Sequence, residues 1–411
     1  MTHVLIIGYV WPEPNSSAAG SRMVELLQLF LDQRWSVTFA SPAADSEYMC
    51  DIEAMGVKKL TIELNNSSFD EMARELNPDI ILYDRFMMEE QFGWRIEKSC
   101  PNALRVLDTV DLHCLRHSRQ LGLKDNTSWT SHLFSEMAHR EVASILRCDL
   151  TLVTSWFEIN LLTETFHTDQ SLLHHLPFML EPIKSLPGPG FTERQHFISI
   201  GNFRHEPNWD AVRHLKETIW PMIRHELPDT ALHVYGAYPP AKATQLHNPR
   251  QGFHVFGRAD DVDSVMKNAR ICLAPLRFGA GIKGKLTDAM RCGTPSITTD
   301  IGSESMHDDL PWSGAIENDP DDFARAAVDV YRDEAKWEEC RKHGVEIINA
   351  CYDKITLGQN VITRLDSIRN TLSAHRLNNF TGSMLRHHTM KSTQYMSRWI
   401  ETKNKLSNQE S

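Results

Sequence analysis

The stretch that decides the fold is residues 271–306, ICLAPLRFGAGIKGKLTDAMRCGTPSITTDIGSESM. The apolar run 271–276 predicts a buried parallel strand, and residues 285–292 predict a helix. Gly293 favours a helix end in the left-handed conformation, and a further strand is expected over 296–299. The stretch therefore predicts strand, glycine-rich loop, helix and strand, as in a parallel α/β sheet.

The loop between this strand and this helix predicts an anion site. Its three glycines, Gly279, Gly281 and Gly284, let the backbone bend closely around a ligand, and Lys283 and Lys285 add positive charge. The following helix directs its free N–H groups and the positive end of its dipole into the same loop. We therefore expect a phosphate or diphosphate here.

The rest of the chain shows the same alternation in two series. The first series predicts strands over 3–8, 36–40, 80–83, 104–107 and 150–154, with helices over 20–33, 132–146 and 157–166. After a Pro- and Gly-rich linker at 181–193, the second predicts strands over 196–200, 231–235, 254–256, 271–276 and 296–299, with helices over 208–225 and 259–268. Two doubly wound α/β domains facing a cleft are expected, with the loops after Gly8 and Leu276 on opposite sides of that cleft.

Composition limits the possible functions. The chain has 411 residues and a net charge of −11, which argues against attraction of the whole molecule to nucleic acid. Its eight cysteines form no C-x-x-C pair, and no signal peptide is evident, so we expect a reducing cytoplasm. No apolar run reaches the roughly 18 residues needed to cross a membrane. The pair His174-His175 has no further ligands at suitable spacing, so no metal site is expected.

Several motifs resemble those of one enzyme family. G-x-G-I-K-x-K-L, then D-A-M-x-x-G-x-P, then G-S-E resemble the donor-site signature of the GT-B glycosyltransferases, most closely family 4. The N-terminal W-P-E-P-N-S-S-A-A-G, L-D-T-V-D-L-H-C-L-R at 107–116, and I-G-N-F-R-H-E-P-N-W-D-A-V at 200–212 resemble the same family. Together these segments cover most of residues 1–370.

The resemblance implies the GT-B fold, two doubly wound Rossmann-like domains around a central cleft. It implies an N-terminal acceptor-side domain at 1–185, a donor-binding domain at 186–354 and a helix at 355–374 that crosses back to the first domain, followed by a basic tail at 375–411. The implied activity is transfer of a hexose from a nucleoside-diphosphate sugar to a hydroxyl acceptor, which is a glycan, a lipid-linked glycan or a protein glycan. The resemblance also implies retention of anomeric configuration, with no metal and no cofactor.

The donor site is expected at the second domain. Arg204 and Lys283 are candidates to stabilise the charge that grows on the departing diphosphate. Asp288, where the family usually has Glu, could accept hydrogen bonds from a ribose diol, and Glu304 could contact a sugar hydroxyl. Ala280 stands where the family pattern has a second Glu. The further donor-binding candidates are Asn202, Gly279, Gly281, Ile282 and Gly284.

The acceptor side is expected at the first domain. Asp108, Asp111 and His113 follow the strand predicted at 104–107 and could orient or deprotonate an acceptor hydroxyl or bind the donor sugar. The small-residue loop of Ser17, Ala19 and Gly20 resembles the loop that, in the family, lets donor phosphates and acceptor approach the first domain.

Two alternatives stay open. Gly279, Gly281 and Gly284 also spell G-x-G-x-x-G, the dinucleotide fingerprint of an oxidoreductase, but that fingerprint belongs after the first strand of its domain. The other alternative is a GT-B protein with a different role, such as a sugar-nucleotide epimerase or a non-catalytic partner, which the missing carboxylate at Ala280 would allow.

The C-terminal segment suggests a peripheral contact with a membrane. Between residues 375 and 405 it has six Lys or Arg residues and one acidic residue, with aromatic and aliphatic residues among them. A basic segment of this kind can lie on an anionic membrane surface, here the inner face, or pack on the domain as an ordinary terminal helix.

Overall fold

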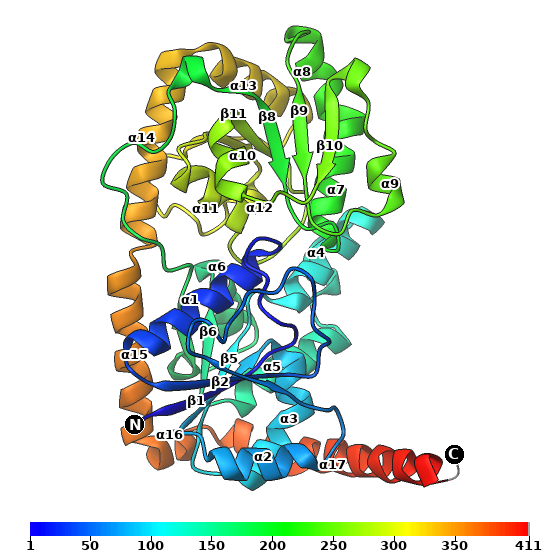
Figure 1. The fold of residues 1–411 in the computed structure, drawn as a ribbon, viewed down its shortest axis with the longest axis vertical. Coiled ribbons are helices and arrows are strands. Elements are labelled where there is room, and N and C mark those ends of the chain that lie inside the picture. Colours follow the sequence, from blue (N-terminus) through cyan, green and yellow to red (C-terminus); the bar gives the residue numbers. More distant parts are fainter. Residues whose placement is uncertain (410–411) are drawn as a thin grey trace.

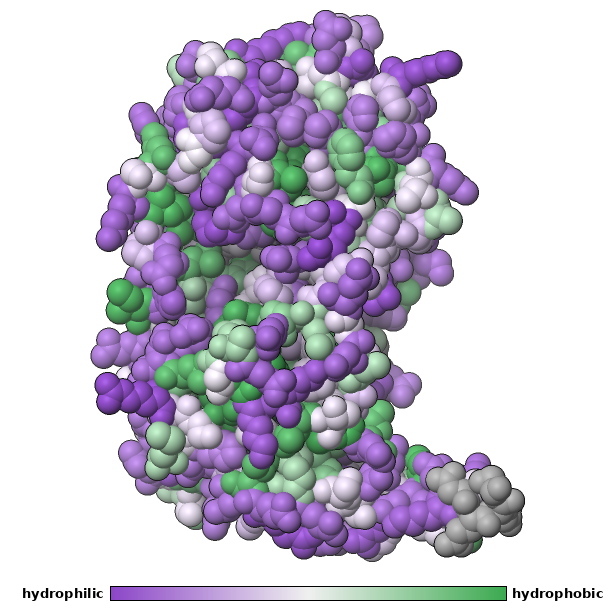
Figure 2. All heavy atoms as spheres, viewed as in Figure 1, coloured by the Kyte–Doolittle hydropathy of each residue, from purple (hydrophilic) through white to green (hydrophobic). Residues whose placement is uncertain are grey.

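The protein has two α/β domains stacked along its long axis (Figure 1), and the outline of the molecule narrows between them on one side (Figure 2). The structure is a computed structural model that describes residues 1–409, without the side chains of 388–390 and 408–409; residues 410 and 411, the end of the predicted basic tail, lie outside it. The described chain contains one sheet of seven strands and one of six, all paired in parallel. The predicted fold class, two doubly wound domains, is confirmed.

The first sheet has the order β3-β2-β1-β4-β5-β6-β7. Its inner strands are almost continuously buried, because helices cover both faces, and this explains their unbroken apolar sequences. The strands are β1 (His3–Ile7), β2 (Ser36–Ser41), β3 (Lys58–Thr61), β4 (Ile80–Asp84), β5 (Leu104–Asp108), β6 (Leu150–Val153) and β7 (Leu173–His175). The helices are α1 (Ala18–Asp32), α2 (Ser68–Leu76), α3 (Phe86–Ser99), α4 (His113–Asp125), α5 (Glu136–Arg147) and α6 (Trp156–Asn160).

The second sheet has the order β10-β9-β8-β11-β12-β13. Its strands are β8 (Gln195–Ile200), β9 (Leu232–Tyr235), β10 (Phe253–Gly257), β11 (Ala269–Ala274), β12 (Ser296–Thr298) and β13 (Gly314–Ile316). Its helices are α7 (Glu206–His214), α8 (Trp220–Glu226), α9 (Ala241–Thr244), α10 (Val262–Asn268), α11 (Gly284–Arg291), α12 (Asp300–Ser303), α13 (Pro320–Arg332) and α14 (Glu334–Cys351). The central strands β8 and β11 pair at Ile271 and Phe197, which both lie in the domain core.

The strand predictions are confirmed within two residues at either end, but some helices differ. The helix expected at 157–166 is α6 followed by a π-helical turn, Leu161–Thr165. The helix expected at 208–225 is α7 and α8 joined by a second π-helical turn, Leu215–Ile219. The helix expected at 132–146 begins only at Glu136, where Ser135 accepts a hydrogen bond from Ala138 N and acts as N-cap.

The chain passes between the domains twice, and the two passages are hydrogen-bonded to each other. Leu180, on the first passage, donates its N–H to Tyr352 O at 2.8 Å and accepts from Lys354 N at 3.0 Å. These bonds form a short parallel bridge between Leu180 and Asp353. The two connections therefore lie side by side as one two-stranded hinge.

After the second passage, α15 (Lys354–Asn370) packs on the first domain. Val361, Leu365 and Ile368 join the core formed by β1, β4, β5 and α1. Gly358 allows close approach to α1, because a Cβ added there would lie 2.9 Å from a methyl carbon of Leu29. The helix thus contributes apolar area to a domain that begins more than 300 residues earlier in the sequence.

The chain ends with α16 (Leu372–Asn378) and α17 (Phe380–Gln409). α17 packs against α3 and α5 and then reaches beyond them (Figure 1). Arg95 donates to Ser397 Oγ at 3.1 Å, and Glu401 accepts from Ser67 Oγ at 2.7 Å, which fixes one face of the helix to the first domain.

We expect Leu365→Ala to lower the free energy of unfolding by about 2–5 kcal/mol, because it opens a cavity in the first-domain core. The matched control is Ile355→Ala on the same helix, where the side chain is 68% exposed and the expected change is within about 0.5 kcal/mol. Urea titration followed by circular dichroism measures both. Equal stability of the two variants would contradict the packing of α15 described here.

Candidate functional site

The glycine-rich loop between β11 and α11 lies against the first domain. Gly281 has a φ of +62°, and a Cβ added there would lie 2.8 Å from Asp111 Cβ. A Cβ on Gly284 would lie 2.6 Å from Ala18 Cβ, at the start of α1. Glycine is therefore required at both positions by the approach of the first domain, and at Gly281 also by the left-handed backbone.

Two side chains of the first domain hold this loop. Glu158 Oε1, at the start of α6, accepts from Gly281 N at 2.9 Å. Arg119, on α4, donates to Gly279 O at 2.8 Å and binds both carboxylate oxygens of Glu304 at 3.0 and 2.6 Å. Glu304, predicted as a sugar ligand, thus forms an ion pair between the domains.

The two lysines of the loop have different surroundings. Lys283 is buried and donates to Gly281 O at 2.7 Å, and Lys285 donates to Asn208 Oδ1 at 2.6 Å. Burial lowers the pKa of Lys283 and of Lys285 to about 8. A bound anion would offset this loss of hydration and stabilise both ammonium groups.

Asp111 and His113 lie together on the first domain, with Asp111 close to the glycine-rich loop. Their Oδ1 and Nε2 atoms are 3.5 Å apart, and Asp111 also pairs with Arg116. Burial favours the neutral form of Asp111, but the charges of Arg116 and His113 outweigh it and hold its pKa below the usual range. Burial lowers the pKa of His113 to about 3, so its imidazole is neutral at physiological pH. The ring of Phe86 meets it edge-on at 5.5 Å.

Two further groups line this part of the cleft and were missed by the sequence reasoning. His205 is the N-cap residue of α7 and lies near Arg116 and Asp111 of the first domain. Burial, followed by repulsion from Arg116 and other cations, lowers its pKa to about 4. Arg85 precedes α3 with a φ of +71° and adds positive potential at both His113 and His205. His205 lies within the quoted motif at 200–212 but was not among the predicted site residues, and no motif contains Arg85.

Asp108 is separated from this group. It is fully buried, and both its oxygens accept hydrogen bonds from Arg22, whose Nη2 lies 2.8 Å from Oδ1. Arg22 also donates to the carbonyl oxygens of Leu176 and Pro177. The pair braces β5 against α1 and the chain leaving β7. Of the three predicted acceptor-side residues, the structure therefore brings Asp111 and His113 together, while Asp108 is engaged with Arg22.

Arg204 has surroundings different from those of Lys283. The guanidinium of Arg204 lies over the ring of Tyr238, 3.6 Å from the ring centroid. The backbone N–H of Arg204 donates to Asn202 Oδ1 at 2.8 Å. Tyr238 OH in turn donates to the Glu13 carboxylate at 2.8 Å, across the two domains. Asn202 also bridges the domains, because its Nδ2 donates to Ser16 O at 3.2 Å.

The remaining donor-side candidates lie on or beside α11. The Asp288 side chain is 37% exposed yet set in a recess, and burial raises its pKa to about 6 although Arg291 opposes this. Glu25, on α1, adds negative potential nearby. Ile282 is 9% exposed and packs in an apolar cluster with Leu286, so it anchors the loop.

The small-residue loop at the N-terminus starts α1. Ser17 is the N-cap and accepts from Gly20 N at 3.1 Å. Gly20 is required, because an added Cβ would lie 2.4 Å from the backbone of Glu13. Ala19 follows in the first turn and is half-buried. The loop thus approaches the glycine-rich loop of the second domain through small side chains only.

Glu158 is the least expected member of the site. Its side chain is fully buried, and Oε1 accepts from both Leu112 N and Gly281 N, while Oε2 has no partner among the described residues. Burial raises its pKa to about 8. In the sequence, Ser155-x-x-Glu158 matches a capping box, and Ser155 does cap α6, but the carboxyl points to the other domain.

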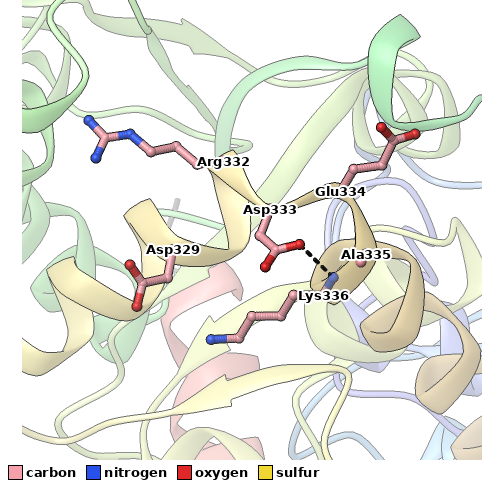
Figure 3. Close-up of a pocket in the computed structure, with 6 residues that line it drawn as sticks. All are labelled: Asp329, Arg332, Asp333, Glu334, Ala335 and Lys336. Carbon is pink, nitrogen blue, oxygen red and sulfur yellow. Dashed lines mark hydrogen bonds between the residues drawn. The ribbon is translucent and has the colours of Figure 1, made fainter.

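A second hollow lies far from this cleft, at the end of the second domain remote from the first (Figures 1 and 3). It has a volume of about 600 Å³ and is lined by Asp329, Arg332, Asp333, Glu334, Ala335 and Lys336. Asp333 accepts from Lys336 N at 3.0 Å, so this is the capped start of α14. It contains both acidic and basic side chains, which point in different directions in Figure 3, so we interpret it as an ordinary helix start.

No three His, Cys, Asp or Glu side chains converge in a metal-binding arrangement within the described part of the chain. His174 and His175 lie on β7, and burial lowers the pKa of each to about 4.

Comparisons with known proteins identify a sequence family and several similar folds. Residues 194–333 match the family described as Glycosyl transferases group 1. The fold is similar to that of sucrose-phosphate synthase from Thermosynechococcus elongatus, with a TM-score of 0.67 and 15% identity over 91% of this chain and 100% of that chain. No curated protein sequence matches the chain.

Two more solved structures share the fold. S. aureus TarM, in complex with Fondaparinux, alpha-GlcNAc-glycerol and UDP, has a TM-score of 0.68 and 10% identity over 89% of this chain and 100% of that chain. Anabaena HepE, in complex with UDP and glucose, has a TM-score of 0.65 and 12% identity, again over 89% and 100% of the two chains.

These findings define the class of the protein. The fold is GT-B, and the segment 194–333, which includes the glycine-rich loop and α11, is a glycosyl transferases group 1 domain. The protein is therefore a glycosyltransferase by class. The glycine-rich loop follows β11, the fourth strand of its domain in sequence, which is not the place of a dinucleotide fingerprint.

We expect Glu158→Gln to flatten the pH dependence of stability. Because the folded-state pKa is raised from 4.5 to about 8, the stabilisation by Glu158 is complete below pH 4.5 and is lost as the pH rises through 8. Glutamine keeps the carbonyl acceptor but does not ionise. The loss of unfolding free energy between pH 5 and 8 should then be smaller than in the native protein by at least about 1 kcal/mol.

Urea titrations at several pH values measure this difference. Glu164→Gln, which neutralises an exposed carboxylate in the following turn, is the control and should leave the pH profile unchanged. A native-like pH profile in Glu158→Gln would show that Glu158 is ionised in the folded protein at neutral pH.

Proposed function

We propose that the protein transfers a hexose from a nucleoside-diphosphate sugar to a hydroxyl acceptor, a glycan, lipid-linked glycan or protein glycan. The observation that carries the proposal is the set of cations around the glycine-rich loop: Lys283 and Lys285 on the second domain, and Arg85 and Arg116 on the first. A chain of net charge −11 that gathers cations in its cleft favours an anionic ligand there. The UDP in the TarM and HepE structures supports a nucleoside diphosphate.

The leaving group is the diphosphate. As the bond between the anomeric carbon and the diphosphate oxygen breaks, negative charge grows on that oxygen, and the acceptor oxygen forms the new bond to carbon. The first-turn N–H groups of α11, together with Lys283 and Lys285, stabilise this charge. These groups are in place before the charge develops, so they do not have to reorient during the reaction. Arg204 and Asn202 border the same cleft, and Asp288 is accessible for a ribose hydroxyl.

The acceptor lies on the side of the first domain. Asp111 and the neutral imidazole of His113 offer a carboxylate and a ring nitrogen to a sugar hydroxyl. The pKa of His113 is lowered to about 3 and the pKa of Asp111 is also lowered, so both groups are hydrogen-bonding partners more than bases, and the acceptor proton leaves to the departing diphosphate oxygen. Retention of configuration and independence of metal ions are part of this proposal on the strength of the family resemblance.

A reducing compartment, the cytoplasm, is also part of the proposal. All eight cysteines are free thiols, and six of them are buried. Burial raises the pKa of several, such as Cys272 and Cys292, each to about 12, so they stay protonated. Unreactive, buried thiols of this kind suit a compartment that keeps cysteine reduced.

A thermal-shift panel with UDP, GDP, ADP and their sugars tests the function. A ligand that binds only the folded protein raises its melting temperature in proportion to affinity, and one nucleotide should stand out. Lys283→Ala and Arg204→Ala should each weaken binding of that nucleotide about tenfold, or 1.4 kcal/mol. Lys336→Ala, in the remote hollow of Figure 3, is the control and should bind as the native protein does.

Product analysis with the stabilising sugar nucleotide separates the alternatives. Transfer to an acceptor or to water releases the free nucleotide, whereas an epimerase returns an isomeric sugar nucleotide. Native-like nucleotide binding and turnover in both Lys283→Ala and Arg204→Ala would overturn the proposed donor site.

We also propose that α17 lies on an anionic membrane surface. No helix within residues 1–409 is long and apolar enough to span a membrane. α17 has five Lys or Arg residues and one Glu, and its outer face carries a stripe of exposed apolar residues that recur at helical spacing. The stripe is formed by Phe380, Met384, Tyr395, Trp399 and Leu406, which are 46–76% exposed.

Vesicle co-sedimentation tests this contact. Vesicles with 30% anionic phosphatidylserine should bind the full chain, and Lys391→Glu with Lys403→Glu should lower the partition coefficient at least tenfold, because each basic residue near an anionic surface contributes about 1 kcal/mol. Lys124→Glu with Lys184→Glu changes the net charge equally on exposed residues elsewhere and should bind as the native chain does. Equal binding by the two double variants would contradict a role of α17.

A further inference from the structure

A hollow of about 380 Å³ lies beside the edge strand β7 of the first domain, under α15. It is separate from the cleft residues described above. Its walls come from three parts of the chain: α6, the segment that leads into β7, and α15. The residues that matter here are Trp156, Gln170, His174, His175, Leu357 and Asn360. Its volume is within the range of small-ligand sites.

An aromatic pair forms one wall. The rings of Trp156 and His175 are stacked, with centroids 4.3 Å apart and an interplanar angle of 26°. Trp156 is nevertheless 45% exposed, an unusual position for the largest side chain. Burial lowers the pKa of His175 to about 4, so the stacked imidazole is neutral at physiological pH. The wall is thus a flat, uncharged aromatic surface that is open to solvent.

Neutral polar groups surround this wall. Gln170 and Asn360 are exposed, and no hydrogen bond joins either side-chain amide to another described residue. Nε2 of His175 is buried and also has no partner within the described chain. None of the side chains that line the hollow is charged, since His174 is neutral as well. The hollow therefore suits a neutral ligand with several hydroxyl groups and does not suit a nucleotide phosphate.

The hollow adjoins the interface between the domains. Trp156 is the first residue of α6, and Phe157 next to it donates its N–H to Ser305 Oγ of the second domain at 3.0 Å. Thr154, just before, has its Oγ1 3.2 Å from where a Cβ on Gly281 would lie. One short turn of chain thus joins the aromatic wall to the glycine-rich loop.

We infer that this hollow binds a pyranose ring of the glycan acceptor, at a distance from the ring that receives the new sugar. The inference rests on the proposed function. The partly positive C–H groups on one face of a pyranose match the negative face of the indole, and its hydroxyls match the amides of Gln170 and Asn360. The site would select acceptors with more than one ring.

Calorimetric titration with maltotriose, cellotriose, mannotriose and chitotriose tests the inference. At least one of the four should bind the native protein, and Trp156→Ala should weaken that binding at least tenfold. Asn360→Ala changes an exposed side chain on another element, and a three- to tenfold loss is expected there. The control is Phe134→Ala, which also removes an exposed ring that contacts a neighbouring ring, here Phe166 in an edge-on arrangement, and it should leave binding unchanged.

The outcomes separate this inference from the proposed function. Failure of all four trisaccharides to bind, or native-like binding by both Trp156→Ala and Asn360→Ala, overturns the hollow as a saccharide site. Nucleotide binding in the thermal-shift panel should be the same in Trp156→Ala and in the native protein, which also shows that the variant is folded. If no nucleotide binds the native protein, the proposed function fails whatever the trisaccharides do.

Discussion

The close contact between the glycine-rich loop and the first domain is the constraint on which the cleft depends. The loop at Gly281 comes so near Asp111 that no side chain fits between them, and the amide of Gly281 is held by Glu158. Arg119 adds a second tie by binding Glu304 and the carbonyl of Gly279. The proposed anion site therefore combines residues from both domains.

Desolvation sets the chemistry inside the cleft. Burial lowers the pKa of Lys283 and of Lys285 to about 8 and keeps His113 and His205 uncharged at physiological pH. Keeping buried ammonium groups charged costs free energy, and a bound anion would offset part of this cost. Burial also raises the pKa of Glu158, so its carboxyl favours the protonated form. This carboxyl lies beside the loop where we propose that an anion binds.

The sequence predicted the fold well where apolar strands are long and buried, as in β1, β4 and β11. It did not reveal the short edge strands β3, β7 and β13, which are only three or four residues long and partly exposed. For the candidate site, a local motif in the sequence contains Gly281, Lys283 and Gly284, and the structure places the two glycines of these three against the first domain. Arg85, Arg119 and Glu158 were missed, because their roles arise from contacts between segments more than 100 residues apart along the chain, which no local spacing encodes.

The paired passages at Leu180 and Asp353 determine how the two lobes can move. A single connection leaves the orientation of one domain relative to the other weakly constrained. Two connections that are hydrogen-bonded to each other at 2.8 and 3.0 Å favour rotation about one axis. Motion about that axis changes the width of the cleft mouth but hardly slides one lobe along the other. A closing motion about that axis would bring the loop at Gly281 back to the same position against Asp111.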